Sequence, residues 1–173
     1  MGNYQTRVNQ ELLLDFFLTF SRFEYALKVS GFFKMPDQSR YDPRCPPSAE
    51  PDWDSFAVSL RGFFLEDRTE RLRQACEYLL ESPPDRQVII RDGCGWATAW
   101  ETPIRPRHET DIEFILRMVK RVRNNLFHGG KHNIELHEET ERTEHLLRCS
   151  LTILKQCLDL SPSVKDFFDQ AII

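Results

Sequence analysis

Residues 110–130, TDIEFILRMVKRVRNNLFHGG, carry the clearest structural pattern in the chain. Thr110 and Glu113 match the capping box, in which an N-cap hydroxyl and a glutamate three positions later satisfy free backbone N–H groups. Apolar residues then recur at spacings of three and four, and two glycines follow as a stop signal. The stretch therefore predicts an amphipathic helix that starts near Thr110 and ends at His128.

The sequence on either side favours further helices. The first, from about Thr6 to Ser30, is apolar over more than one stripe, so we expect it at the centre of the fold. The other helical segments are 54–65, 66–80, 138–158 and a short terminal helix that begins after Ser161-Pro162.

Two segments depart from helix. Residues 34–53 carry five prolines, which predicts a long loop. Residues 87–101 pair a β-rich run with a turn around Gly93, which predicts a small hairpin. The expected fold class is mainly all-α: a single domain over 1–173, built as a helical bundle with a long Pro-rich loop and a small β-hairpin insertion.

Length and composition limit the classes of protein that fit. The 173 residues suffice for one domain with a real core, and the net charge of −4 excludes a binder that is basic throughout. Five cysteines without a C-x-x-C spacing indicate neither a disulfide framework nor a zinc ribbon. No stretch predicts a secretion signal or a membrane-spanning helix, so we expect a cytoplasmic protein that does not use a membrane.

The charge is nevertheless unevenly distributed along the chain. Between Phe114 and Ile134 there is no Asp or Glu, whereas five residues are basic: Arg117, Lys120, Arg121, Arg123 and Lys131. Of these, Lys120, Arg121 and Lys131 are candidates to bind RNA phosphates. Basic residues late in a helix also favour its negative end, so both interpretations stay open.

Arg123, Asn124 and His128 are the candidate catalytic residues. Asn124 and His128 are four positions apart and share a helix face, and Arg123 lies beside them. RNA cleavage without a metal needs groups that transfer protons, which histidine supplies, and a cation for the pentacoordinate phosphorus, which arginine supplies. One chain offers one such histidine, so two copies across a twofold axis would supply both a base and an acid.

The order Arg123-Asn124-x-x-x-His128 resembles the R-N-x-x-x-H signature of the HEPN superfamily, and residues 20–28, FSRFEYALK, resemble the first helix of a plasmid- and phage-associated subgroup. The resemblance implies a HEPN-like helical bundle and a metal-independent endoribonuclease that leaves a 2′,3′-cyclic phosphate. It also implies a homodimer in which two motifs face one cleft, no cofactor, a role as a toxin or antiphage effector, and a possible cognate antitoxin.

The chain departs from one branch of that superfamily, whose toxins carry a tyrosine two residues after the histidine as the target of a nucleotidyltransferase antitoxin. Gly130 stands there, so no such partner is expected. Within the first helix, Arg22 and Glu24 can hold the side chain of Arg123 in position or form an ordinary ion pair beside the core. The alternative function is a non-catalytic HEPN module that binds a protein or a nucleic acid.

Two further hypotheses concern metals and bases. Four histidines, His128, His132, His137 and His145, raise the possibility of a metal-dependent hydrolase, but no H-E-x-x-H is present and no metal site is expected. Trp53, Trp96 and Trp100 can stack on bases or pack within the protein.

Overall fold

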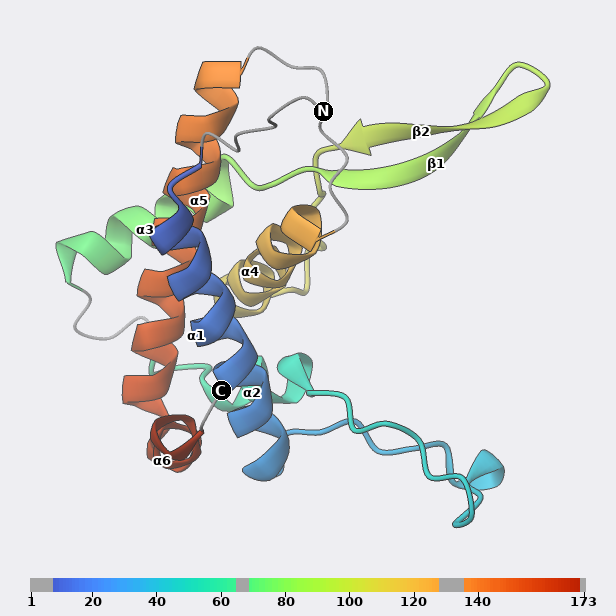
Figure 1. Cartoon of the computed structure of the whole chain (residues 1–173), viewed down its shortest axis with the longest axis vertical. Coiled ribbons are helices and arrows are strands. Elements are labelled where there is room, and N and C mark those ends of the chain that lie inside the picture. Colours follow the sequence, from blue (N-terminus) through green and yellow to red (C-terminus); the bar gives the residue numbers. More distant parts are fainter. Residues whose placement is uncertain (1–7, 65–68, 128–135, 172–173) are drawn as a thin grey trace.

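The structure is a computed structural model, and it describes residues 8–64, 69–127 and 136–171. Within these ranges the chain is mainly helical and carries one antiparallel hairpin (Figure 1), which confirms the coarse prediction. The elements are, in chain order, α1 (Gln10–Val29), η1 (Gln38–Arg40), α2 (Trp53–Ser59), α3 (Glu70–Glu81), β1 (Arg86–Asp92), β2 (Gly95–Glu101), α4 (Asp111–Phe127), α5 (Leu136–Leu160) and α6 (Pro162–Gln170).

Helix α1 starts later than the predicted position near Thr6. The side-chain carbonyl of Asn9 accepts a hydrogen bond from the backbone N–H of Leu12 at 3.1 Å, so Asn9 is the N-cap. At the other end Gly31 adopts φ 98°, a left-handed conformation that favours glycine. The helix therefore ends where the sequence predicts.

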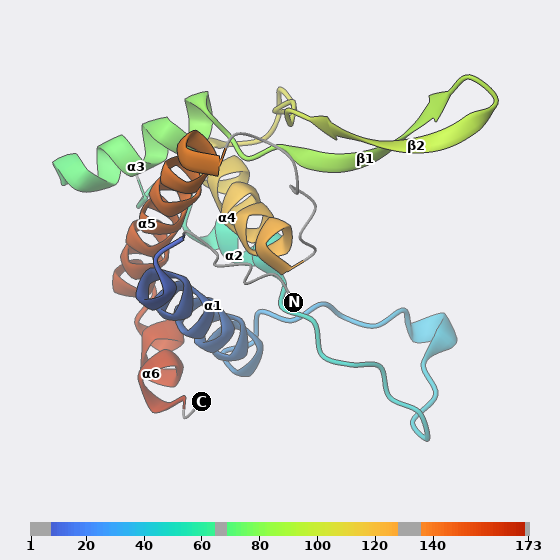
Figure 2. The ribbon, with the colours of Figure 1, turned by 45° about the horizontal axis from the view of Figure 1, so that its top comes forward.

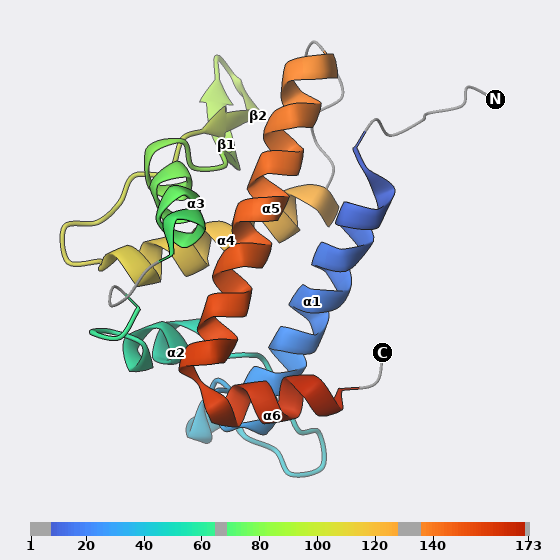
Figure 3. The same cartoon turned by 90° about the vertical axis from the view of Figure 1, so that its left-hand side faces the viewer.

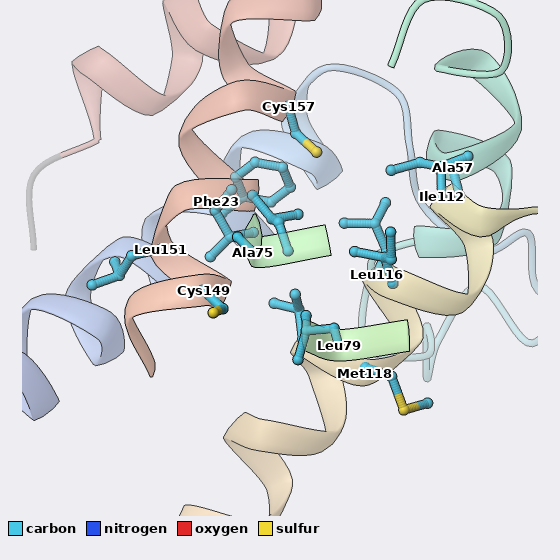
Figure 4. Close-up of a cluster of buried hydrophobic side chains, with 14 of the residues drawn as sticks. Phe23, Ala57, Ala75, Leu79, Ile112, Leu116, Met118, Cys149, Leu151 and Cys157 are labelled. Carbon is cyan, nitrogen blue, oxygen red and sulfur yellow. The ribbon is translucent and has the colours of Figure 1, made fainter. Parts of the chain in front are cut away.

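The core lies where five helices meet. Helix α5 packs along α1 and α3, and α6 crosses the ends of α1 and α5 (Figure 3). Figure 4 shows apolar side chains from α1, α2, α3, α4 and α5 gathered in one cluster. The indole of Trp53 stacks on Phe20 and Phe23, with ring centroids 5.3 Å and 5.2 Å away. Trp53 is therefore a core residue and is not available to stack on a base.

The predicted helices over 54–65 and 66–80 are both too long. Helix α2 ends at Ser59, and Gly62 then takes φ 91°, a conformation that no α-helix contains. Helix α3 begins only at Glu70, because the hydroxyl of Thr69 accepts from the N–H of Leu72 at 3.2 Å and caps it.

The proline-rich segment is a loop, as predicted, with only the short η1 inside it. A bridge between Phe33 and Pro51 joins its two ends, and the N–H of Lys34 donates to the carbonyl of Glu50 at 2.9 Å. The side chains of Lys34 and Glu50 also form an ion pair at 3.1 Å. The loop thus leaves the helical body through a closed neck and extends away from it (Figure 2).

The hairpin is confirmed and extends from the helices in a different direction (Figures 1 and 2). Pairing runs from Arg86 opposite Glu101 to Asp92 opposite Gly95, and Gly93 takes φ 57° in the turn. The indole of Trp96, near the turn, is 74% exposed. An isolated two-stranded hairpin is marginally stable in water, so its attachment at the base matters for its position.

The last three helices agree with the prediction apart from small shifts at their ends. The carboxylate of Glu113 accepts from the N–H and the hydroxyl of Thr110 at 2.8 Å and 2.5 Å, which supplies the reverse half of the capping box of α4. Helix α5 extends two residues beyond the predicted 138–158 at each end, and Pro162 occupies the first turn of α6 as expected.

Candidate active site

Two of the three candidate catalytic residues lie together near the end of α4. Arg123 comes four residues after the buried Val119, so it lies at the edge of the core face and is half-buried, whereas Asn124 points outward and is exposed. The Nη1 atom of Arg123 donates a hydrogen bond to Oδ1 of Asn124 at 3.1 Å. The guanidinium is therefore held by its neighbour while Asn124 itself remains exposed.

Aromatic rings from two helices surround the Arg123 guanidinium. Its central carbon lies 5.7 Å from the ring centroid of Phe20 on α1 and 5.0 Å from that of Phe127 on α4. The ring of Phe127 in turn lies 5.4 Å from Phe17. The sequence predicted that Phe127 points away from the site and anchors α4, which is wrong, because its ring is half-exposed and contacts Arg123. Phe17 and Phe20 were visible only as part of the dense phenylalanines of the first helix.

The third candidate, His128, lies outside the described residues, and so do Lys131 and His132. Helix α4 is described as far as Phe127, the residue directly before His128. The described part of the site is thus its arginine and its asparagine.

Lys120 and Arg121, the two candidates on α4 for binding RNA phosphates, are both half-buried. Burial, and then the nearby guanidiniums of Arg117 and Arg86, lower the pKa of Arg121, an effect that Asp85 and Glu101 oppose only in part. Its Nη1 atom is buried and has no hydrogen-bond acceptor among the described residues. Arg121 therefore lies among two other guanidiniums and two carboxylates, and its buried Nη1 atom has no partner in the described ranges.

Arg22 and Glu24 make contacts away from Arg123. The Nη2 atom of Arg22 donates to the backbone carbonyl of Phe168 at 2.7 Å, and its guanidinium lies 4.3 Å from the centroid of that ring. The carboxylate of Glu24 accepts from the indole N–H of Trp53 at 3.2 Å. These bonds hold α1 against α6 and α2, and the two side chains do not pair with each other.

The exposed side of α1 carries apolar residues beside the Arg123 site. Leu14, Phe17 and Tyr25 are 57%, 40% and 47% exposed, and their spacing places them on one face of the helix. Phe127, which contacts Phe17, is 51% exposed and continues this surface onto α4. We call the surface formed by Leu14, Phe17, Tyr25 and Phe127 the α1 stripe.

A pocket of about 320 Å³ opens on the other side of Asn124, between α4 and the base of the hairpin. Its lining residues are Arg86, Gln87, Trp100, Arg121, Asn124 and Asn125. The amide of Asn125 donates to the backbone carbonyl of Asp85 at 2.8 Å and so ties the hairpin base to the helix. Asn124 is the residue that this pocket shares with the Arg123 site.

In the described ranges, no three His, Cys, Asp or Glu side chains lie close enough to bind a metal ion. Of the four histidines considered earlier, His145 packs its ring against Tyr78, with centroids 4.1 Å apart. Among the helices that the structure describes, none combines the length and the apolarity that crossing a membrane requires.

The chain was compared with protein-family models, with curated proteins and with solved structures, and none of them matches. The function of this site is therefore inferred from its own residues and their geometry.

Proposed function

We propose that the chain is a HEPN-type, metal-independent endoribonuclease that acts as a cytoplasmic homodimer. The observation that carries the proposal is the placement of Arg123: its guanidinium is bonded to Asn124 and lies against two aromatic rings near the end of α4, five residues before His128. A positioned cation beside a group that transfers protons is what transesterification of RNA needs.

In the proposed reaction, one His128 takes the proton from a ribose 2′-hydroxyl. The freed oxygen attacks the adjacent phosphorus, and Arg123 stabilises the negative charge on the pentacoordinate phosphate. The bond to the 5′-oxygen then breaks, and the His128 of the second copy protonates that oxygen. The products are a 2′,3′-cyclic phosphate and a 5′-hydroxyl, with no cofactor consumed.

The α1 stripe supports the dimer. Its apolar residues are exposed beside Arg123, and an apolar surface next to a half-site favours burial against a second copy. We further propose that α1, α4 and α5 correspond to the HEPN-like bundle. The protein would act as a toxin or an antiphage effector, with a cognate antitoxin as its candidate partner.

The deciding experiment compares four proteins on RNA with EDTA present: wild type, Arg123→Ala, His128→Ala and the matched control His108→Ala. His108 is exposed in the segment before α4 and belongs to no proposed site. Wild type and the control should cleave, and the product 5′ ends should accept phosphate from a kinase without prior dephosphorylation. His128→Ala should cleave at least about a hundredfold more slowly.

Equal cleavage by wild type and a folded His128→Ala protein would contradict the proposal, and so would loss of cleavage in EDTA. RNA binding without any cleavage by wild type would favour the non-catalytic module. A growth assay tests the setting: induction of wild type in a bacterial host should stop growth, whereas induction of His128→Ala should not.

A further inference from the structure

The pocket between the hairpin base and α4 is built from two elements. Figures 1 and 2 show the base of the hairpin next to α4, and the hydrogen bond from Asn125 to the carbonyl of Asp85 fixes them together. β1 and β2 contribute Arg86, Gln87 and Trp100, and α4 contributes the remaining residues. The hairpin therefore has a defined attachment, and its base completes a cavity of about 320 Å³.

The charges around the pocket leave one guanidinium incompletely paired. Arg86 binds Glu101 at 2.6 Å, and Arg117 binds Glu109 at 2.6 Å, so each has its own carboxylate. Arg121 has a buried Nη1 atom with no acceptor in the described ranges, and the carboxylates of Asp85 and Glu101 offset only part of the repulsion from the other two guanidiniums. An anion that enters the pocket would relieve this repulsion and accept hydrogen bonds from Arg121.

The remaining lining groups are suited to a flat heterocycle. Trp100 provides an indole, and Gln87, its cross-strand partner, provides an amide on the same face of the hairpin. Asn124 and Asn125 add amides from the helix. An aromatic surface binds the face of a base, and amides bind its polar edge.

We propose that this pocket binds one nucleotide of the RNA substrate, with its phosphate at Arg121 and its base against Trp100. The proposal rests on the endoribonuclease function above. Asn124 lines the pocket and also accepts the hydrogen bond from Arg123, so the bound nucleotide lies beside the phosphate that reacts. The hairpin thereby selects the base next to the cleavage position.

Binding is measured apart from cleavage, with a fluorescent single-stranded RNA whose 2′-oxygens are methylated and which cannot be cut. The test variants are Trp100→Leu, Trp100→Phe and Arg121→Gln in the full chain. Trp96→Leu and Arg91→Gln are matched controls, because both residues lie on the hairpin outside the pocket. Circular dichroism checks that each variant is folded.

Trp100→Leu and Arg121→Gln should each weaken binding about tenfold, as expected for loss of one stacked base or one phosphate contact. Trp100→Phe keeps an aromatic face and should stay within about threefold of wild type, and both controls within about twofold. If Trp100→Leu and Arg121→Gln bind as tightly as wild type, the pocket is not a nucleotide site.

A competition arm identifies the source of the nucleotide. Free AMP, GMP, CMP and UMP are added to the complex with the methylated RNA. If the mononucleotides compete weakly or not at all, the pocket binds a nucleotide that is part of an RNA chain. If a mononucleotide displaces the RNA at equal concentration, the ligand is a free nucleotide and the proposal of an RNA nucleotide is wrong. Cleavage assays separate the two proposals: a wild type that binds through Trp100 but never cuts RNA refutes the nuclease alone, and one that cuts RNA indifferently to Trp100 refutes the pocket alone.

Discussion

Arg123 is fixed by its surroundings before any ligand arrives. One nitrogen is engaged by Asn124, and the central carbon of the guanidinium lies 5.7 Å from the ring centroid of Phe20 and 5.0 Å from that of Phe127. A planar guanidinium can stack on rings and still present its remaining N–H groups to a phosphate in a forked arrangement. An ammonium group of the same charge can do neither.

Arg123→Lys should therefore lower the single-turnover cleavage rate by about a hundredfold, although the charge is kept. The measurement is the cleavage rate at saturating RNA with EDTA present. Arg107→Lys, in the exposed segment before α4, is the control and should cleave at the wild-type rate. A rate for Arg123→Lys within a few-fold of wild type would mean that only the charge matters.

Glu24 should contribute to the stability of the fold and not to cleavage. Its carboxylate accepts from the indole N–H of the buried Trp53, and Glu24→Leu removes that acceptor. The free energy of unfolding should fall by about 1–3 kcal/mol in a urea titration, because a buried donor loses its partner.

Glu24→Gln retains an acceptor oxygen and should unfold within about 1 kcal/mol of wild type. Cleavage at saturating RNA should be the same for both variants below their unfolding transitions. A folded, stable Glu24→Leu protein that has lost cleavage would instead assign Glu24 to the site.

At the scale of elements, α4 depends on the carboxylate at its start. The hydroxyl and the N–H of Thr110 and then the guanidinium of Arg61 hold the pKa of Glu113 below its ordinary value. A carboxylate with a depressed pKa in the folded protein stabilises it above the unfolded pKa, and this contribution is lost as the pH falls through the folded pKa.

Glu113→Gln should thus cost about 1 kcal/mol of unfolding free energy at pH 7, and the difference from wild type should shrink as the pH falls below about 4. Urea titrations at neutral and acid pH measure it. Glu141→Gln, an exposed position on α5, should show no such pH-dependent difference. A cost that stays constant with pH would show that the negative charge of Glu113 is not involved.

The elements that the sequence predicted well are those with local signals. Thr110 and Glu113 mark the start of α4, the prolines mark the loop, and Gly93 marks the hairpin turn. The errors occurred at the end of α2, where apolar residues continue past the helix, and at the start of α3, where a charged run carries no clear stop signal. The left-handed conformation of Gly62 and the capping bond of Thr69 set these two boundaries, and neither is visible in the sequence pattern.

At the scale of the whole molecule, the α1 stripe should hold two copies together. Phe17→Asp places a charge in its centre and should convert a dimer to a monomer in light scattering, with loss of cleavage. Phe63→Asp is the control, because Phe63 is 62% exposed in the segment after α2 and should leave the dimer intact. A monomeric wild type that cleaves RNA would contradict the two-copy mechanism.

Some features of the candidate site can be predicted from neighbouring residues in the sequence, whereas others depend on contacts between distant segments. Arg123 and Asn124 are neighbours in sequence, so their spacing could indicate a shared role. The ring of Phe20 and the pairing of Trp100 with Arg121 around one pocket depend on how α1 and the hairpin meet α4. No periodicity in the chain encodes those contacts, and only the folded arrangement reveals them.

The closed neck of the proline-rich loop has a practical consequence. Because Phe33 and Pro51 are bridged and Lys34 is bonded to Glu50, the chain enters and leaves the loop at one place on the helical body. Lengthening a loop whose ends are already joined adds little closure entropy. The loop tip around Cys45 is therefore a suitable place to insert an affinity tag or a fluorescent domain, far along the chain from α4.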